Sequence, residues 1–422
     1  MIADLKHQFF RKLNSRFFYG WVILAVTTVV MFGSGAGQSH WVGLFFEPLS
    51  DELGLSRTAV ALAYGGATFV AAFFLPRLGR VIDRYGAART LLVIAVVLSI
   101  SCIGFAATRN WTSIAVGFAL VRFLGQGALA LCCVNLVSQW FSARRGFAMG
   151  LMALGFPLSM AIHPPLGQWA IDHIGWRETW IWMGASTAVL LIPAVALFLF
   201  SKPEQVGLAP DGKVPSPNER ATAGAISGLT LAQALREPAF YIIGVSLFSL
   251  SMLVTALHVE NKGLLMAHGL SAQTAALMFT VTGVVAAAAM PIVGWMLDRF
   301  PTERMLVGGL LIMVGSLWSV TFVSDLKGAV VYAIIFGINN GVTMTYFAFL
   351  WPRFFGRKHL GSIQGTGQMV GIVGASLGPL PLAIAIDSLG GYDTMLRVLS
   401  ILPLACAIAA LSLREPKGLN AS

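Results

Sequence analysis

Few side chains in the apolar stretches of this 422-residue sequence can carry charge or a proton, and these few mark where chemistry is possible. Arg122, His163 and His258 lie inside long apolar runs, and His40 lies near the end of one. An arginine keeps its charge at any accessible pH, whereas an imidazole changes charge near neutral pH. Ionisable side chains in a bilayer are costly and usually face a cavity or a partner. Arg122 and His163 are therefore candidates for binding or coupling, and His40, His258 and Glu260 are candidates for an outer vestibule.

Arg122 has two interpretations that the sequence leaves open. It lies eleven residues beyond Trp111, about 16 Å along a helix and so near mid-membrane, and Gln126 shares its face at i+4. Arg122 can serve an anion or a coupling step, or it can donate to carbonyl groups of neighbouring helices. His163 precedes Pro164, where a helix must kink. A histidine hydrogen-bonded in that kink is favoured over one that carries a coupling proton.

Two later apolar runs add neutral polar side chains. Those in the run near 328–351 gather on or beside one helix face, where hydrogen bonding between helices competes with a binding role. The run 361–386 contains no Arg or Lys, so its glutamines are the strongest polar candidates. No Asp or Glu lies deep in a predicted span, which argues against an organic cation as ligand. These further candidates are Asn339, Asn340, Tyr346, Gln364 and Gln368.

The elements that must position these side chains are membrane-spanning helices. Hydrophobic residues make up 57 % of the chain and charged residues 11 %, against roughly 45–50 % and about 25 % in soluble domains. In hydrocarbon every backbone polar group needs an internal partner, so apolar segments of spanning length must be helical. Twelve such segments are expected near 19–45, 57–78, 89–107, 111–139, 146–171, 178–200, 239–260, 272–297, 304–323, 328–351, 361–386 and 393–413.

The basic residues fix the expected orientation of these spans. Of the 28 Lys and Arg residues, 21 fall on one side of the predicted membrane and six on the other. The positive-inside rule then places both termini in the cytoplasm of a multi-pass protein of the plasma membrane, in a bacterium the inner membrane. The segment between the sixth and seventh spans is rich in Pro, Gly and charge and reads as a linker. The expected parts are a cytoplasmic segment 1–18, a six-helix half 19–200, a cytoplasmic linker 201–238, a six-helix half 239–413 and a cytoplasmic tail 414–422.

An internal repeat relates the two halves through a constant offset of 215 residues. A repeat of six helices keeps its membrane orientation, which is the parallel arrangement that places a transport site near mid-bilayer between the halves. The alternative is a structural duplication with no role in transport. We predict an all-α membrane protein with twelve transmembrane helices in two six-helix parallel repeats. Matching residues include Gly54 with Gly269, Gly79 with Gly294, Asp83 with Asp298, Arg84 with Arg299, and Gly175 with Gly390.

The loop after the second span carries a recognisable motif. It reads GRVIDRYGAAR, and its repeat copy reads GWMLDRFPTER. This resembles the loop signature of the major facilitator superfamily, and RFLGQG at Arg122 is similar to the arginine-bearing fourth-helix motif of that superfamily. The resemblance implies the major facilitator fold and a cytoplasmic gate made of Gly79, Asp83, Arg84, Gly86, Arg89, Gly294, Asp298 and Arg299.

Other segments narrow the resemblance. WFSARRGFAMG, GWRET, PEQVGLAPDG and RFFGRKHLGSIQG are similar to the monocarboxylate transporter and oxalate/formate antiporter branch. The resemblance implies a secondary active transporter of a monocarboxylate-type organic anion that works by alternating access, with proton coupling or exchange. That branch commonly meets the carboxylate with cations in its eighth or eleventh helix. Here 271–297 and 361–386 contain no Arg or Lys, so a dianion is not expected, and a monoanion and a polar neutral solute both remain open.

Two alternatives to this function remain. One is a drug or metabolite exporter of the same superfamily. Such exporters carry a longer Gly-Pro motif in the fifth helix, and Gly155–Pro157 of this sequence matches that motif poorly. The other is a non-transporting membrane sensor on this scaffold. No paired catalytic acids, metal-ligand spacing or phosphate-binding loop occurs, so no enzyme activity, cofactor or metal is expected. The expected partners are a small anionic solute, protons and the lipid bilayer, without nucleic acid, for a protein that acts as a monomer.

Overall fold

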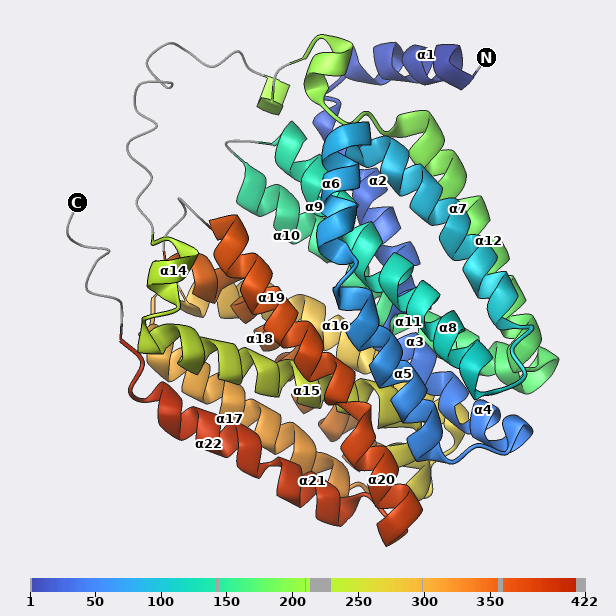
Figure 1. Cartoon of the computed structure of the whole chain (residues 1–422), viewed down its shortest axis with the longest axis vertical. Coiled ribbons are helices and arrows are strands. Elements are labelled where there is room, and N and C mark those ends of the chain that lie inside the picture. Colours follow the sequence, from blue (N-terminus) through green and yellow to red (C-terminus); the bar gives the residue numbers. More distant parts are fainter. Residues whose placement is uncertain are drawn as a thin grey trace. The chain divides into compact units, whose positions relative to one another are not determined.

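The computed structural model of the chain is helical throughout the part that it describes, residues 2–141, 144–208, 210–212, 229–297, 299–355 and 360–414 (Figure 1). Eleven helical segments of these residues are long and apolar enough to cross a membrane. The predicted all-α membrane fold is therefore confirmed. The predicted span 57–78 is divided between α5 (Arg57–Ala72) and α6 (Leu75–Tyr85). Pro76 lies in the first turn of α6 and has no N–H to extend α5, which explains the break.

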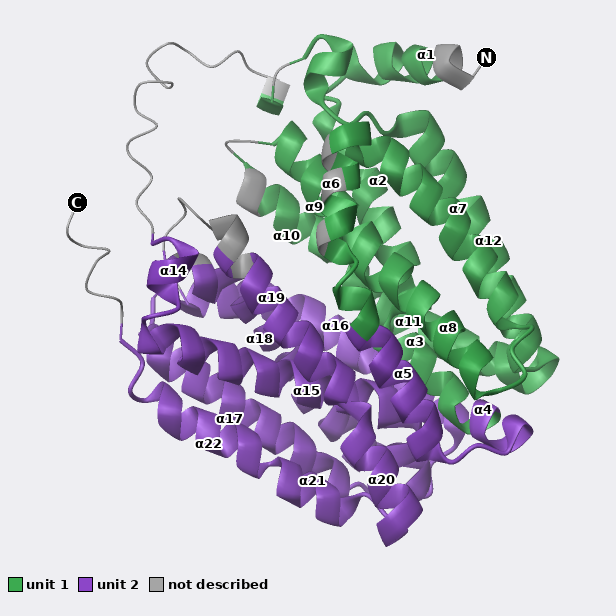
Figure 2. Ribbon diagram, in the orientation of Figure 1, with its two compact units in different colours: residues 1–48, 70–217 green, residues 49–69, 218–422 purple. Residues whose placement is uncertain are grey.

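The chain forms two compact units (Figure 2). Unit 1 comprises residues 1–48 and 70–217, and unit 2 comprises residues 49–69 and 218–422. The chain passes from one unit to the other within the predicted linker 201–238, but the first part of α5 belongs to unit 2. The boundaries of the predicted halves stay a prediction.

Unit 1 begins with a helix that is attached to a later part of the same unit. The Lys6 amino group donates to the Leu199 carbonyl and lies 4.2 Å from the centre of the Phe200 ring. Burial and the Arg89 charge lower the pKa of Lys6. Trp140 Nε1 donates to the Phe200 carbonyl at 2.9 Å. The helices of unit 1 are α1 (Ile2–Asn14), α2 (Gly20–Gly33), η1 (Ser34–Gly37), α3 (Ser39–Val42), η2 (Gly43–Phe45), α6, α7 (Ala87–Phe105), α8 (Trp111–Val121), η3 (Arg122–Ala128), α9 (Leu129–Trp140), α10 (Arg145–Ala153), α11 (Gly155–Ile174), α12 (Trp176–Phe198), η4 (Pro203–Val206) and η5 (Pro210–Gly212).

Unit 2 is built around two helices of 30 residues each, α15 (Pro238–Ala267) and α18 (Leu326–Phe355). Large aromatic side chains, among them Tyr332 and Trp351, are fully buried in its core. Helix α4 (Phe46–Leu53) leads from unit 1 into unit 2. The remaining helices of unit 2, besides α5, are α14 (Leu231–Ala234), α15 (Pro238–Ala267), α16 (Ala272–Leu297), α17 (Thr302–Thr321), α18 (Leu326–Phe355), α19 (Leu360–Leu377), α20 (Pro379–Leu389), α21 (Asp393–Leu399) and α22 (Ile401–Ala410).

The 215-residue offset recurs in the backbone conformation of the turns. Gly54 and its counterpart Gly269 have φ of 62° and 84°, and Gly175 and Gly390 have φ of 87° and 67°. These values lie in the left-handed region, which glycine adopts without steric cost. Matched glycines therefore make matched turns in the two copies of the repeat.

Candidate functional site

The first long helix of unit 1 is interrupted within the predicted span 19–45. Helix α2 ends at Gly33, η1 follows, and Gln38 is extended, with φ −90° and ψ 153°, before α3 begins. Gly33, Gly35 and Gly37 each weaken a helix because glycine has the most conformational freedom to lose. We call residues 34–40 the broken segment, and all seven are buried. Non-helical backbone at membrane depth is tolerated only where protein covers it or it lines a cavity.

A second irregularity lies against the broken segment. The predicted span 111–139 is not one α-helix, because η3 is a π-helix from Arg122 to Ala128 between α8 and α9. A Cβ added to Gly37 would lie 2.3 Å from the Val121 carbonyl oxygen and 2.7 Å from the Gly125 Cα. The two backbones thus approach too closely for any side chain larger than hydrogen. Single π turns are frequent at functional sites.

Arg122 joins these two irregular segments. Its guanidinium is only 2 % exposed, and Nη1 donates to the Gly37 carbonyl at 2.7 Å and lies 3.5 Å from Ser39 Oγ. The break in the helix leaves that carbonyl available for the arginine. These two acceptors are neutral oxygen atoms, so neither of them cancels the guanidinium charge. Gln126 lies half-buried in the same π turn.

Two histidines extend this polar cluster along unit 1. His40 Nε2 lies 3.1 Å from Ser159 Oγ, and Ser159 Oγ lies 2.8 Å from His163 Nδ1. His163 also stacks on Phe32, with the ring centres 4.5 Å apart, and lines an apolar pocket of about 290 Å³. His40 follows Ser39 directly, so the broken segment connects the Arg122 contacts with the Ser159 contacts. The cluster places both candidate histidines of unit 1 in one hydrogen-bonded row.

The candidate side chains on α18 differ in their hydrogen-bond partners. The Tyr346 hydroxyl donates to the Met305 carbonyl on α17. Asn340 Nδ2 donates to the Phe336 carbonyl at 2.8 Å, and the centre of the His258 ring lies 5.0 Å from the centre of the Phe336 ring. Asn339 is 0 % exposed, and neither its Nδ2 nor its Oδ1 has a hydrogen-bond partner among the described residues.

Sequence reasoning missed a buried ion pair in unit 2. Glu260 Oε2 accepts from Arg57 Nη1 at 3.2 Å and from the Tyr392 hydroxyl at 2.8 Å. Glu260 is 1 % exposed, and α15 continues to Ala267, beyond the predicted end of this span at 260. Glu260 is therefore buried within α15, one to two turns before the end of the helix. The available signal was a lone Glu inside an apolar run, with Arg57 among the few basic residues on the minority side.

The predicted gate motif is only partly described. Gly79 lies in α6, Gly86 ends it with φ 84°, Gly294 lies in α16, and Arg84 and Arg89 are exposed. The side chains of Asp83 and Gln364 and the whole of Asp298 lie outside the described residues. Gln368 is exposed on α19.

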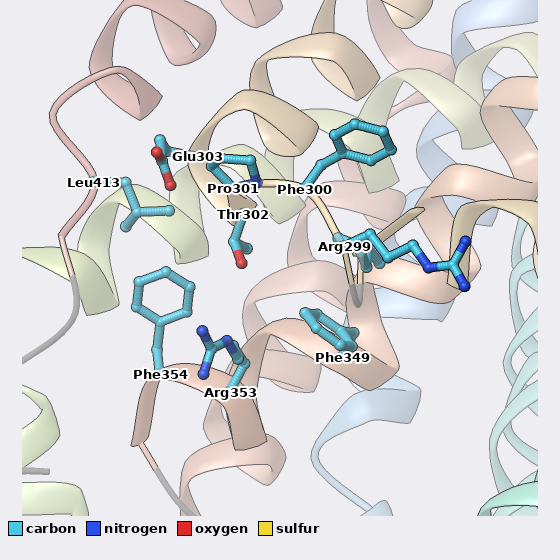
Figure 3. Close-up of a pocket in the computed structure, with 10 residues that line it drawn as sticks. Arg299, Phe300, Pro301, Thr302, Glu303, Phe349, Arg353, Phe354 and Leu413 are labelled. Carbon is cyan, nitrogen blue, oxygen red and sulfur yellow. The ribbon is translucent and has the colours of Figure 1, made fainter. Parts of the chain in front are cut away.

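The second copy of the motif borders a pocket of about 600 Å³ in unit 2. Figure 3 shows Arg353 and Thr302 pointing toward one another across this pocket, whereas the Arg299 guanidinium points away from it. Arg299 instead lies 4.2 Å from the centre of the Trp295 ring. Arg353 therefore faces the pocket, whereas the Arg299 guanidinium packs on an aromatic ring outside it.

The helical membrane fold agrees with the comparison to known proteins. The model of the Major Facilitator Superfamily matches residues 22–379 and again 262–421, so the chain belongs to this superfamily of transporters. The chain is 27 % identical over 386 residues to human monocarboxylate transporter 11, covering 89 % of this chain and 78 % of that protein. It is 23 % identical over 380 residues to rat monocarboxylate transporter 4, covering 86 % and 76 %.

Solved structures show the same fold. The crystal structure of the nucleoside transporter NupG superposes with a TM-score of 0.71 at 13 % identity, covering 93 % of this chain and 99 % of that one. The chain is therefore a multi-pass membrane transporter of this superfamily and not an enzyme, as predicted, and its partner is a small-molecule substrate.

Proposed function

We propose that this protein is a secondary active transporter of a small monocarboxylate-type anion and that Arg122 is the main electrostatic determinant of binding. The observation that carries the proposal is the position of Arg122. A permanent charge is buried where a π turn meets a broken helix, and its acceptors on Gly37 and Ser39 are neutral. A charge removed from water attracts an anion far more strongly than a solvated one. The similarity to monocarboxylate transporters supports the same class of substrate.

The broken segment gives the binding proposal a structural basis. Interrupted helices in transporters present backbone groups to substrates and ions. Here the interruption holds Arg122 through the Gly37 carbonyl and places Ser39 and His40 beside it. A carboxylate could replace Ser39 as a guanidinium partner without disturbing the carbonyl bond. Transport would then follow by alternating access, with the substrate exchanged or accompanied by a proton.

The test compares Arg122→Gln with Arg122→Lys in the purified protein, with L-lactate as probe and its methyl ester as neutral control. Losing a hydrogen bond to a charged group costs about 1.5–3 kcal/mol, which is roughly a ten- to 150-fold loss of affinity. Arg122→Gln should weaken lactate binding by that factor, and Arg122→Lys should recover part of it, because lysine lacks the planar fork. The ester should bind weakly to all three proteins.

An opposite result would assign Arg122 to packing alone. In that case Arg122→Gln would lower the thermal stability of the ligand-free protein and leave lactate affinity within about twofold. Binding and melting are therefore measured on the same preparation.

We further propose that both termini face the cytoplasm of the plasma membrane and that the Gly79–Arg89 loop belongs to the cytoplasmic gate. The distribution of basic residues supports this orientation. A single cysteine at position 327 should react with an impermeant reagent outside intact cells, and one at position 213 should not. The reverse labelling would exclude this orientation.

A further inference from the structure

The ion pair in unit 2 consists of groups with very different access to solvent. Arg57, at the start of α5, keeps 20 % of its side chain exposed, whereas Glu260, within α15, keeps 1 %. Arg57 can therefore leave the pair and be solvated. Glu260 cannot, because the rest of unit 2 covers it. A buried carboxylate that loses its basic partner is strongly unfavourable.

The two oxygens of the Glu260 carboxylate are also unequal. Oε2 accepts both hydrogen bonds, from Arg57 and from the Tyr392 hydroxyl. Oε1 is buried and accepts no hydrogen bond from any described residue. An ionised carboxylate normally accepts bonds on both oxygens, whereas a protonated one needs fewer. Oε1 is thus a position where a proton can reside without displacing an existing donor.

The chain is shaped to bring these groups together. A Cβ added to Gly263, one turn along α15 from Glu260, would lie 2.5 Å from the Tyr392 hydroxyl and 2.6 Å from Arg57 Nη1. Arg57 Nη1 also donates to the Tyr392 hydroxyl at 2.8 Å. The arrangement is therefore a closed triangle of three side chains over a glycine.

We propose that Glu260 is a proton-binding site, and that its protonation releases Arg57 and with it the first turn of α5. Glu260 takes one proton from water on Oε1 and becomes neutral, and Arg57 leaves for solvent with its own charge unchanged. Releasing Arg57 from an ionised Glu260 would strand a buried carboxylate, so proton binding and helix release are thermodynamically linked. The site rests on the proposed function only for its role in coupling protons to transport.

Other charged groups near this site limit the movement. Among the described residues, Arg57, Tyr392 and Asp387 are the titratable groups whose charge or hydrogen bonds reach Glu260. Asp387 Oδ2, on α20, accepts from the Thr58 N–H at 2.9 Å and so holds the N-terminus of α5 separately. This second attachment provides a matched control, because it can be removed while Glu260 is kept.

Pulsed electron–electron distance measurements on the full-length purified protein test the proposal without any substrate. Spin labels at Leu62→Cys on α5 and Leu326→Cys at the start of α18 use two exposed positions of unit 2. The four native cysteines are buried. Lowering the pH from about 8 to about 5, a range that protonates buried carboxyl groups in other proteins, should populate a second distance in the wild-type background. Asp387→Asn should keep this response.

Two further variants make the result decisive. Glu260→Gln, the neutral isostere, should show the low-pH distribution at every pH. Tyr392→Phe removes one donor to the ionised form and should move the midpoint to higher pH by about one unit. The proposal is overturned if Glu260→Gln keeps the wild-type pH response, or if the wild type shows none while Tyr392→Phe and Glu260→Gln elute as folded protein. A pH response without lactate binding would keep the proton site and remove the proposed substrate.

Discussion

The two repeats differ in helix regularity at the position of Arg122 in unit 1, whose counterpart in unit 2 is Gly337. In unit 1 a π turn occupies 122–128, and the first helix is broken over 34–40. The equivalent residues 337–343 and 249–255 lie inside the uninterrupted helices α18 and α15. A Cβ added to Gly337 would lie 2.8 Å from the Thr282 carbonyl oxygen, so this position packs α18 against α16.

This difference indicates which features belong to the duplicated scaffold. The shared turns at Gly54 and Gly269 show that the repeat supplies the connections between helices. The interruption and the buried arginine occur in unit 1. At the matching positions unit 2 keeps α15 and α18 uninterrupted, and these helices bury polar side chains such as Asn339 and Glu260 instead. The buried charge of Arg122 and the helix interruption therefore belong to one copy of the repeat and not to the scaffold that both copies share.

The largest effect is expected from filling the contact between the two irregular helices of unit 1. Gly37→Ala places a Cβ against backbone atoms that cannot move independently. Such overpacking costs about 1–3 kcal/mol or more, which lowers the melting temperature by several degrees. Gly104→Ala, whose Cβ would meet nothing within 4 Å, should have a smaller effect. Equal melting temperatures for Gly37→Ala and Gly104→Ala would mean that the backbones do not meet.

An increase in stability is expected from Asn339→Leu in unit 2. A buried polar group without a partner costs about 1–3 kcal/mol, and a leucine of similar size removes that cost. Thermal unfolding should show a higher midpoint for Asn339→Leu and a lower one for Asn340→Leu, which loses its bond to the Phe336 carbonyl. If Asn339→Leu is less stable than the wild type, the amide has a partner that stabilises the fold. A loss of lactate binding would instead assign Asn339 to the substrate.

The smallest effect is expected from Ser39→Ala. Its hydroxyl lies 3.5 Å from Arg122 Nη1, at the limit of a hydrogen bond, whereas the Gly37 carbonyl lies at 2.7 Å. We expect a loss of stability below about 0.5 kcal/mol, because the stronger contact remains. A change comparable to that of Arg122→Gln, measured by thermal unfolding, would show that Ser39 holds the guanidinium in unit 1.

The sequence was sufficient to predict the helices, the repeat and the superfamily, because apolar length and matched glycines are local signals. It also identified Arg122 as exceptional. The π turn was not predictable, because it depends on how Gly37 packs against Gly125. The Glu260 pair required Arg57 and Tyr392, which are far away in sequence and are brought together only by folding.

That long separation affects how the protein is made. The hydrogen bond from Lys6 of α1 to the Leu199 carbonyl can form only after Leu199 has been synthesised, when the chain is about 200 residues long. Arg57 precedes Tyr392 by 335 residues, which at about 5–20 residues per second takes roughly 20–70 s to synthesise. During this time α5 is present without the partners that fix its first turn. One of the first membrane segments of the nascent chain therefore forms its contacts among the last. A ribosome that stalled near residue 217 would leave Arg57 without Glu260 and Tyr392.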